Sequence, residues 1–375
     1  MIMRRITQVE VFPTKIGLKT KFNIGTGFVG DQHSSGDHIF VKISTDDGYF
    51  GWGEQRALPS WSYETTESIT TTIQSYITPV LIEKDPFEIL KITDEINTIL
   101  KPAVSNGHPF ARAAVDIALH DLVGRILGVP IHVLLGGKRH SQYPLCYALS
   151  IDTPEVMAMQ AVALDPCHCF KVKVAGEPGL DEARLRAIND AVPEAKLWID
   201  ANQSYVPSQA IDLIDRIRDI RQIATFEQPV SSQDWFGLKR VREHSHLPIA
   251  VDEGCFSSYD LAKIIQLECA DAVVLKLCKS GGLRECLKTA HIAEANSIEL
   301  LGSGLTEAGI GFVASLHLFS TLDFILPPEL NAPAFLESMV AHGIETRDAV
   351  AVIPDRPGLG ILPDEDYIIE NQIHF

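Results

Sequence analysis

The stretch "CFKVKVAG", residues 169–176, has the alternation of a buried β-strand and carries two lysines one residue apart. Side chains alternate between the faces of a strand, so Phe170, Val172 and Val174 share one face and Lys171 and Lys173 share the other. A solvated edge strand of an antiparallel sheet would explain two neighbouring like charges. A functional site at the end of a covered strand would also explain the two lysines. The surrounding sequence distinguishes between these two explanations.

From residue 142 onward, short apolar strands alternate with amphipathic helices such as "LDEARLRAINDAV", "PSQAIDLIDRIRDI" and "LRECLKTAHIAEAN". A strand, a helical crossover and the next parallel strand form a right-handed unit, and eight such strands favour a closed barrel. We therefore predict an α/β fold, a TIM-like parallel barrel, over residues 140–335. The predicted strands are 143–149, 169–174, 196–201, 224–228, 248–252, 271–277, 297–302 and 321–326.

The first part of the chain, residues 1–135, has a different order, with strands first and helices afterwards. This order predicts a separate α+β domain. The segment 346–375 contains a strand-like run, "DAVAVIP", and we expect residues 340–375 to fold back on this first domain. The predicted strands are 2–12 and a hairpin over 38–54 that turns at residues 46–48, and the predicted helices are 63–82, 86–100 and 109–127.

Charged residues stand at the ends of five successive predicted barrel strands, with separations of 27, 27, 25 and 24 residues. Each separation is one strand–helix unit, so these side chains converge at the carboxyl-terminal mouth of a barrel, where barrel active sites form. Since helices cover the outside of barrel strands, Lys171 and Lys173 are expected to point into the mouth. The five strand-end residues are Lys173, Asp200, Glu227, Asp252 and Lys276.

Three of these residues are acids, and their mutual repulsion needs an explanation. Three carboxylate pairs at about 4 Å and an effective dielectric constant of about 20 would cost roughly 12 kcal/mol. A bound cation removes this cost, and ligation by oxygen atoms alone suits magnesium or manganese. Ion pairs with lysines from helices or loops are the alternative for any single acid.

The lysines beside the acids acquire a role in such a site. A partly desolvated lysine near a metal ion and a second ammonium group is expected to have its pKa lowered toward neutrality. It can then act as base or acid near pH 7. A metal flanked by two such lysines is suited to removing a proton α to a carboxylate, with the metal stabilising the enediolate that forms.

At these residues the sequence resembles the enolase superfamily, and within it the muconate-lactonizing subgroup of the mandelate racemase/muconate lactonizing enzyme family. The similarity extends over nearly the whole chain, from the segment that joins the first domain to the barrel as far as the later glycine-rich segments. The stretches that carry it are "AAVDIALHDLVGRILGVPIHVLLGG", "FKVKVAG", "WIDANQ", "FEQP", "VDE", "LKLCKSGGL", "GLTEAGIGFVASLH" and "PGLGI".

The resemblance implies a (β/α)7β barrel with an N-terminal α+β capping domain. It implies that Lys173 and Lys276 are the acid/base pair and that Lys171 lowers the pKa of Lys173 and contacts the substrate carboxylate. Asn202 and Glu253 would lie near the metal without binding it directly. The implied ligands of Mg²⁺, or of Mn²⁺, are Asp200, Glu227 and Asp252.

The resemblance favours a muconate cycloisomerase-like isomerase acting on a small carboxylic acid. Alternatives are a racemase or epimerase of an N-substituted amino acid or proline derivative, and an o-succinylbenzoate synthase-type lyase. The eighth-strand segment "PPELNAP" lacks the DxD of dipeptide epimerases and places Glu329 there. We expect the cap segments 21–33 and 55–63, with Phe22 and Trp61, and the eighth-strand end at Glu329–Pro333 to contact the rest of the substrate. The cap segments would act as a closing lid.

Two other classes of function remain as alternatives to an isomerase or lyase. A catalytically silent barrel that serves as a binding protein would be expected to have lost at least one of the five strand-end charges. A sugar-phosphate enzyme would need a phosphate site after the last two strands, and "GSGLTEAG" from residue 302 could supply backbone amides there. That scheme leaves the three acids without a role.

The composition narrows the range of partners. Among 375 residues, 49 acidic and 32 basic side chains give a formal net charge of −17. Such a charge repels nucleic acid and anionic membranes, so we expect neither as a partner. The seven cysteines have irregular spacings, which favours reduced thiols. We see no secretory signal or membrane span, and we predict a cytoplasmic homo-oligomer with a small carboxylate as substrate.

Overall fold

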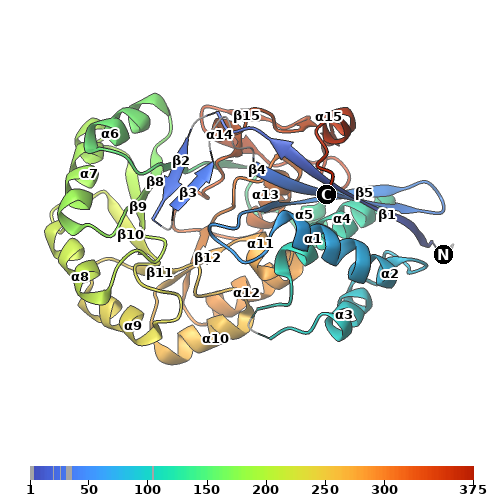
Figure 1. Cartoon of the computed structure of the whole chain (residues 1–375), viewed down its shortest axis with the longest axis horizontal. Helices are drawn as coiled ribbons and strands as arrows, with labels where there is room; N and C mark the ends of the chain where they lie inside the picture. Colours follow the sequence, from blue (N-terminus) through green and yellow to red (C-terminus); the bar gives the residue numbers. More distant parts are fainter. Residues whose placement is uncertain (1–3, 20, 26, 31–35, 104) are drawn as a thin grey trace.

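The computed structural model of the protein describes residues 4–19, 21–25, 27–30, 36–103 and 105–375. Helices α6 to α10 surround the barrel strands on one side of the molecule, and the antiparallel strands β1, β4 and β5 lie on the other side with helices α1 to α4 (Figure 1). The two parts match the predicted combination of an α/β barrel and an N-terminal α+β cap.

The cap is built on a three-stranded antiparallel sheet in the order β1-β4-β5. Its hairpin turns after Thr45, as predicted, and Gly48 takes the positive φ of 87° that this turn requires. Gly53 lets helix α4 approach β5 closely, because a Cβ atom there would lie 1.8 Å from the Ala114 carbonyl oxygen. The elements are β1 (Ile6–Ile16), β4 (Gly36–Thr45), β5 (Phe50–Ala57), α1 (Thr66–Thr72), the π-helical turn η1 (Ile73–Ile77), α2 (Thr78–Leu81), α3 (Ile89–Ile99) and α4 (Pro109–Leu127).

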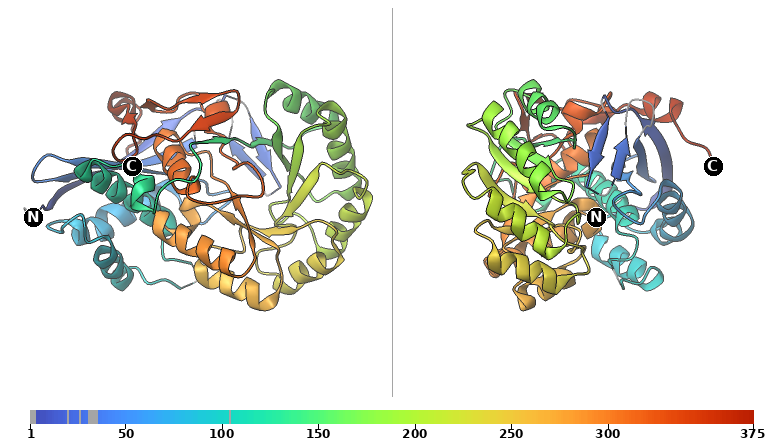
Figure 2. Two further views of the ribbon diagram at one scale, coloured as in Figure 1. Left: turned by 180° about the vertical axis from the view of Figure 1, so that it is seen from behind. Right: turned by 60° about the vertical axis from the view of Figure 1, so that its left-hand side comes forward.

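The barrel contains seven hydrogen-bonded parallel strands in sequence order, each followed by a helical segment (Figures 1 and 2). The strands are β7 (Tyr147–Leu149), β8 (Cys169–Lys173), β9 (Lys196–Asp200), β10 (Ile223–Glu227), β11 (Ile249–Val251), β12 (Ala272–Leu275) and β13 (Glu299–Gly302). The helices are α6 (Pro154–Ala163), α7 (Pro178–Ala191), α8 (Pro207–Arg216), α9 (Trp235–His244), α10 (Ser258–Leu267), α11 (Leu277–Ser280), α12 (Leu283–Ala295) and α13 (Gly309–Phe319).

The eighth strand does not form where the sequence predicted it. Residues 321–326 are a turn and loop after α13, and the barrel is closed by isolated parallel bridges from Glu329 to Cys146 and Ser303. The reason is that Pro327 and Pro328 have no N–H groups to donate to a ladder. The Glu329 N–H donates to the Gly302 carbonyl at 2.8 Å, and the Pro328 carbonyl accepts from the Cys146 N–H at 3.0 Å.

The first predicted barrel strand, 143–149, is divided between two sheets. The segment β6 (Gln142–Pro144) pairs with β16 (Val350–Val352), and only β7 joins the barrel. The end of the chain lies against the cap, where the Ile373 N–H donates to the Pro13 carbonyl at 2.7 Å. The division into domains at 1–135, 140–335 and 340–375 stays a prediction. The remaining elements are α5 (Ile131–Leu134), α14 (Ala332–Phe335), β14 (Ala341–His342), β15 (Thr346–Arg347), β17 (Leu362–Pro363) and α15 (Glu365–Glu370).

A small hairpin of the cap reaches the barrel mouth. It consists of β2 (Phe22–Ile24) and β3 (Gly27–Gly30), which lie beside β8 and β9 in Figure 1. The Asn23 N–H donates to the Ser150 hydroxyl at 2.9 Å. A Cβ atom at Gly25 would lie 2.4 Å from the Ala201 carbonyl oxygen, so glycine allows the hairpin to rest directly on the end of β9.

All seven cysteines are free and buried, which agrees with the expectation of reduced thiols. Three of them, Cys146, Cys167 and Cys169, lie in the buried core of the barrel. Among the helices in the described part of the chain, none combines the length and the apolar character needed to cross a membrane.

Candidate active site at the barrel mouth

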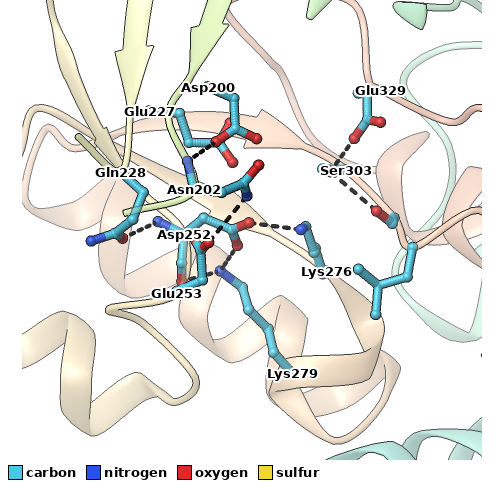
Figure 3. A network of polar contacts seen from close by, with 12 residues as sticks. Asp200, Asn202, Glu227, Gln228, Asp252, Glu253, Lys276, Lys279, Ser303 and Glu329 are labelled. Carbon is cyan, nitrogen blue, oxygen red and sulfur yellow. Dashed lines mark hydrogen bonds and ion pairs between the residues drawn. The ribbon is translucent and has the colours of Figure 1, made fainter. Parts of the chain in front are cut away.

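The five charged strand-end residues lie together at the carboxyl ends of the barrel strands. In the parallel register Lys173 pairs with Asp200, which pairs in turn with Glu227. Asp252 directly follows β11 and Lys276 directly follows β12. The three carboxylates are fully buried at 0% exposure, and the two lysines are buried as well. Figure 3 shows the acids and Lys276 gathered in one network.

Two lysines hold the Asp200 side of this site. The Lys171 ammonium group donates to Glu227 Oε1 at 2.9 Å and lies 3.1 Å from Asp200 Oδ2. The Lys173 ammonium group donates to the same Asp200 oxygen at 2.5 Å and to Asn202 Oδ1 at 3.1 Å. Both lysines of the opening motif therefore point into the barrel mouth.

Two further lysines hold the Asp252 side. Lys276 Nζ lies 2.6 Å from Asp252 Oδ2, and Lys279 donates to Asp252 Oδ1 at 2.7 Å and to the Asp252 carbonyl at 2.9 Å (Figure 3). The indole ring of Trp61 lies over the Lys276 ammonium group at 4.1 Å and stacks on Phe256. A cation over an aromatic face is stabilised by the ring quadrupole, so Trp61 helps to fix Lys276.

A set of carboxylate oxygens in the network fits a metal ion. One oxygen each from Glu227, Asp252 and Glu253 can be chosen so that all lie within 4.8 Å of one another. Among the described residues, Glu227 Oε2 and Glu253 Oε2 are buried and have no hydrogen-bond partner. Buried polar oxygens without partners are rare in proteins, and an all-oxygen donor set suits magnesium. Asp200, which the resemblance includes among the ligands, is turned toward Lys171 and Lys173 instead.

The carboxylates are not left to repel one another. Burial acts to raise the pKa of Asp200, but the ammonium groups of Lys171 and Lys173 hold that pKa well below its usual range. Burial opposes ionisation of Asp252 in the same way, and Lys276 and Lys279 lower the pKa of that carboxyl. The lysines therefore largely offset the carboxylate repulsion expected from the sequence. The unpartnered oxygens of Glu227 and Glu253 indicate a cation more strongly than this repulsion does.

Two other carboxyl groups of the network have a raised pKa. Burial and the neighbouring Asp200 raise the pKa of Glu227 well above its usual value. Burial raises the pKa of Glu253 to about 7, and the charge of Asp252 acts in the same direction. Asn202 Nδ2 donates to Glu253 Oε1 at 3.1 Å and so ties this carboxyl to the Asp200 side (Figure 3).

The lysines differ from expectation in the direction of their pKa shifts. Burial acts to lower the pKa of Lys171, but Asp200 and Glu227 raise that pKa well above its ordinary value. Burial also opposes the charge on Lys276, and Asp252 raises its pKa above the ordinary value. The protein groups by themselves thus favour ammonium ions, because carboxylates surround each lysine. The lowered pKa expected from the sequence depends on the charge of a cation.

Glu329 is a fixed part of the pocket wall. The Ser303 hydroxyl and the Asn331 amide both donate to its carboxylate, and Lys171 Nζ lies 3.6 Å from Glu329 Oε2. Asn331 accepts in turn from the Ala148 N–H at 2.9 Å. The sequence Glu-Leu-Asn at 329–331 therefore places a carboxylate and an amide at the point where the barrel closes.

Lys171, Lys173 and Lys276 line a pocket between the barrel mouth and the cap. The predicted residues Phe22 and Trp61 are among those that line it, and Phe22 packs on Phe335 with ring centroids 5.3 Å apart. The lining consists of Phe22, Ile24, Val29, Arg56, Leu58, Trp61, Lys171, Lys173, Asn202, Lys276, Gly304, Leu305, Thr306, Glu329 and Asn331.

The sequence indicated neither Lys279 nor Gln228, and it included Arg56 and Asn331 only within longer candidate segments. Lys279 is three residues after Lys276, one turn along the same short helix, and this spacing could have indicated it. Gln228 accepts from the Asp252 N–H at 3.0 Å, and it follows a strand-end glutamate in "FEQP". Asn331 lies two residues after Glu329, in the predicted end of the eighth strand. Arg56 lies in the predicted cap segment 55–63, but no spacing in the sequence singled it out.

Comparison with known proteins agrees with the fold. Residues 156–367 match the enolase C-terminal domain-like family. Residues 8–136 match the N-terminal domain of the mandelate racemase/muconate lactonizing enzyme family. Together the two matches include all three acids at the strand ends and all four lysines of the network.

Relatives with established activities cover nearly the whole chain. N-succinyl-L-Arg/Lys racemase of Bacillus cereus is 32% identical over 372 residues, 98% of this chain and 97% of that protein. The structure of muconate lactonizing enzyme from Pseudomonas fluorescens, complexed with muconolactone, gives a TM-score of 0.93 at 27% identity, covering 99% of this chain and 100% of that one. The dipeptide epimerase from Enterococcus faecalis, complexed with Mg and L-Leu-L-Tyr, gives 0.89 at 34% identity, covering 96% and 99%. The chain belongs to the mandelate racemase/muconate lactonizing enzyme family of the enolase superfamily and is an isomerase.

Proposed function

We propose that this isomerase binds magnesium and moves a proton at the carbon next to a substrate carboxylate, as a racemase or epimerase of an N-substituted amino acid. The observation that carries the proposal is the pair of buried lysines, Lys173 and Lys276. They line one pocket from β8 and from the end of β12, and three strands with the acidic network lie between them. Such a pair can serve the two faces of one carbon atom.

The donor set for the metal would be Asp200, Glu227 and Asp252, with Asn202 and Glu253 beside it. Asp200 would have to turn from Lys171 and Lys173 toward the metal, whereas Glu253 already has an oxygen close to those of Glu227 and Asp252. Magnesium, when bound, would supply positive charge that stabilises the negative charge developing on the substrate carboxylate. The unpartnered oxygen of Glu227 and the magnesium in the structure of the related dipeptide epimerase support this assignment. Manganese has the same preference for oxygen ligands and is a second metal to test.

Each lysine would have a separate task. Lys173 would remove or return the proton on one face of the α-carbon, and Lys276 would do so on the other face. Lys171, held between Glu227 and Asp200, would lie beside the substrate carboxylate.

Racemisation is placed ahead of the cycloisomerisation predicted from the sequence because of the relatives. A full-length relative at 32% identity is a racemase of N-succinylated amino acids. Cycloisomerisation stays as a second candidate, because the muconate lactonizing enzyme superimposes with a TM-score of 0.93. In a cycloisomerase only one lysine would transfer the proton, and the other would stabilise charge.

The test is proton NMR in deuterated water with magnesium on a library of N-acylamino acids and unsaturated dicarboxylic acids. Exchange of the α-hydrogen for deuterium with interconversion of enantiomers would support a racemase. Formation of a lactone from an unsaturated diacid, without exchange in any amino acid derivative, would support the second candidate. The proposal fails if neither exchange nor lactone formation occurs with any member of the library.

Several expectations from the sequence accompany this proposal. We propose a small carboxylate as substrate, a cytoplasmic location and a homo-oligomeric state, and we expect no nucleic-acid or membrane partner. The net charge of −17 supports the last of these, because it repels phosphate groups.

A further inference from the structure

The loop after β13 forms part of the pocket wall and contains a threonine whose polar groups are unused. Thr306 lines the pocket together with Lys276 and Trp61. Among the described residues, neither the hydroxyl nor the N–H group of Thr306 has a hydrogen-bond partner. Such groups in a pocket wall bond either to water or to a ligand that displaces the water.

Accessible surface distinguishes Thr306 from the other unpartnered groups of this wall. The indole N–H of Trp61 and two nitrogen atoms of Arg56 also lack partners, but these atoms are buried. The Thr306 hydroxyl is not among the buried atoms, and the residue as a whole is half-buried. The remaining polar side chains of the wall are engaged with one another or with the acidic network, and these are Lys171, Lys173, Asn202, Lys276, Glu329 and Asn331.

The backbone of Thr306 has a conformation that its residue type rarely adopts. Its φ is 63°, in the left-handed region, which is an outlier for a β-branched residue. Strain of this kind persists only where the surrounding structure holds it, and it gathers at ligand sites. A glycine would avoid the strain, so the threonine side chain at this position calls for a reason other than stability.

Hydrogen bonds hold the loop on both sides of the strained residue. Before it, the Leu305 N–H donates to Glu307 Oε2 at 2.8 Å, and the Leu305 carbonyl accepts from Arg56 Nη1 at 2.8 Å. After it, the Ala308 N–H donates to Glu54. Arg56 and Glu54 both lie on β5, so a strand of the cap fixes this part of the barrel mouth.

The same contacts argue against the phosphate site considered from the sequence. A phosphate bound by this loop would need free amides at the start of α13. Glu54 already accepts from two of them, the N–H groups of Ala308 and Gly311. What remains in the loop is a pair of neutral donors on Thr306, which suits a neutral acceptor better than an anion.

We infer that Thr306 is a specificity-determining residue whose hydroxyl and N–H groups bind the carbonyl oxygen of the acyl group on the substrate nitrogen. In the parallel register Gly302 pairs with Leu275, the residue before Lys276, so the loop of Thr306 lies on the Lys276 side of the pocket. An N–H group can only donate, so the group that it binds must be an acceptor.

A free ammonium group on the substrate would find no partner in this loop. The carboxylates of Glu54 and Glu307 are occupied by backbone N–H groups. The loop therefore favours an N-acylated amino acid over a free one. This inference rests on the proposed function and names the feature of the N-substituent that the pocket recognises.

The test compares variants that separate the hydroxyl group from the shape of the side chain. Thr306→Val keeps the β-branched shape and loses the hydroxyl, whereas Thr306→Ser keeps the hydroxyl and loses the branch. For α-hydrogen exchange of an N-acetylamino acid with magnesium, we expect Thr306→Val to raise KM about 3- to 10-fold, as loss of one hydrogen bond would give. Thr306→Ser should keep most of the wild-type value. A role in packing alone would give the reverse order.

The substrate then identifies the group that Thr306 binds. The N-thioacetyl analogue has sulfur in place of the carbonyl oxygen, and sulfur accepts hydrogen bonds weakly. The effect of Thr306→Val on KM should therefore be smaller for this analogue. Thr98→Val, at an exposed position on α3, is the matched control and should behave like wild type with both compounds.

Two results would overturn the inference. One is an unchanged KM for the N-acetyl compound in Thr306→Val, and the other is an equal change for the N-acetyl and N-thioacetyl compounds. If Thr306→Val does not fold, Thr306→Ala, which removes the hydroxyl without adding atoms, takes its place in both comparisons. Absence of exchange with every compound in wild type would instead contradict the proposed function.

Discussion

At the scale of single residues, the site depends on which partner each lysine has. Lys173 is held by Asp200 and Asn202, whereas Lys276 is held by Asp252 and covered by Trp61. Because no carboxylate is shared between them in these contacts, each lysine can change its protonation with little effect on the position of the other. This independence is what a two-base racemase requires.

Substitution of each lysine should abolish α-hydrogen exchange of a different enantiomer. In Lys173→Ala, α-hydrogen exchange of one enantiomer should fall by about 100- to 10,000-fold, the usual loss of a positioned acid or base, while exchange of the other enantiomer continues. Lys276→Ala should show the opposite preference. Proton NMR of each pure enantiomer in deuterated water measures both rates. Circular dichroism serves as the control for folding, and equal losses for both enantiomers in both variants would contradict the two-base geometry.

Glu64 is a buried acid outside the site that should make stability depend on pH. It accepts from the Phe110 N–H at 2.8 Å at the start of α4, and burial raises its pKa to about 7. The folded state therefore binds this proton more tightly than the unfolded state, whose pKa is about 4.3. Stability is lost as pH rises from about 4 to 7, by about 3 kcal/mol from this group.

The expected result is a flatter pH profile in Glu64→Gln. Urea unfolding at pH 5 and pH 7.5 should show a smaller decrease in stability for this variant than for wild type. Glu370→Gln, at an exposed position in α15, is the matched control and should behave like wild type. A variant Glu64→Gln that loses as much stability between the two pH values as wild type would show that Glu64 does not titrate in this range.

At the scale of elements, the regular βα units of the barrel could be predicted from the sequence, whereas the irregular eighth strand could not. The spacing of Asp200, Glu227 and Asp252 follows the βα repeat, so their convergence could be predicted. The eighth strand could not, because Pro327 and Pro328 interrupt an apolar run that otherwise has the pattern of a strand. Its pairing is reduced to the bridges at Glu329 and a hydrogen bond from the Ile325 N–H to the Leu300 carbonyl at 3.2 Å. These contacts depend on neighbours far away in the sequence.

Contacts between the cap and the barrel also could not be predicted from the alternation of residues within one strand. Arg56 lies on a cap strand with alternation that indicates only a sheet, and its place in the pocket depends on how the two parts pack. The segments around Phe22 and Trp61 could be named from the sequence, since glycine and aromatic residues mark them, and both residues line the pocket. Their role as a lid stays a prediction. Which of their atoms face the pocket required the structure.

The hairpin β2–β3 and the segment after β5 should control substrate choice. Phe22→Ala and Trp61→Ala each remove an aromatic wall of the pocket, so KM should rise by about 10-fold or substrate preference should change, as expected for lost apolar contact. Magnesium affinity, measured by isothermal titration, should stay unchanged. Phe236→Ala, at a position 78% exposed on α9, is the control and should match wild type. Wild-type kinetics in both pocket variants would exclude the cap as the specificity element.

At the scale of the whole molecule, the acidic network connects metal binding to stability. Five carboxylates and four lysines are buried within one network at the barrel mouth, and they come from strands and loops spread over residues 171–329. The lysines offset the carboxylate charges, so the barrel should fold without a cation. A cation that binds the unpartnered oxygens should then add stability by linkage.

Activity should require a divalent cation, and the same cation should raise the melting temperature. Protein treated with a chelator should lose α-hydrogen exchange and regain it with magnesium or manganese.

Magnesium at 100 times its Kd should add about 2.7 kcal/mol of stability to the folded protein. The melting temperature should rise accordingly in wild type. Glu227→Gln should lose this rise because it removes a ligand oxygen, whereas Glu329→Gln should keep it because Glu329 is satisfied by Ser303 and Asn331. Full activity in metal-free protein, or an equal rise in both variants, would show that the carboxylate network does not hold the metal.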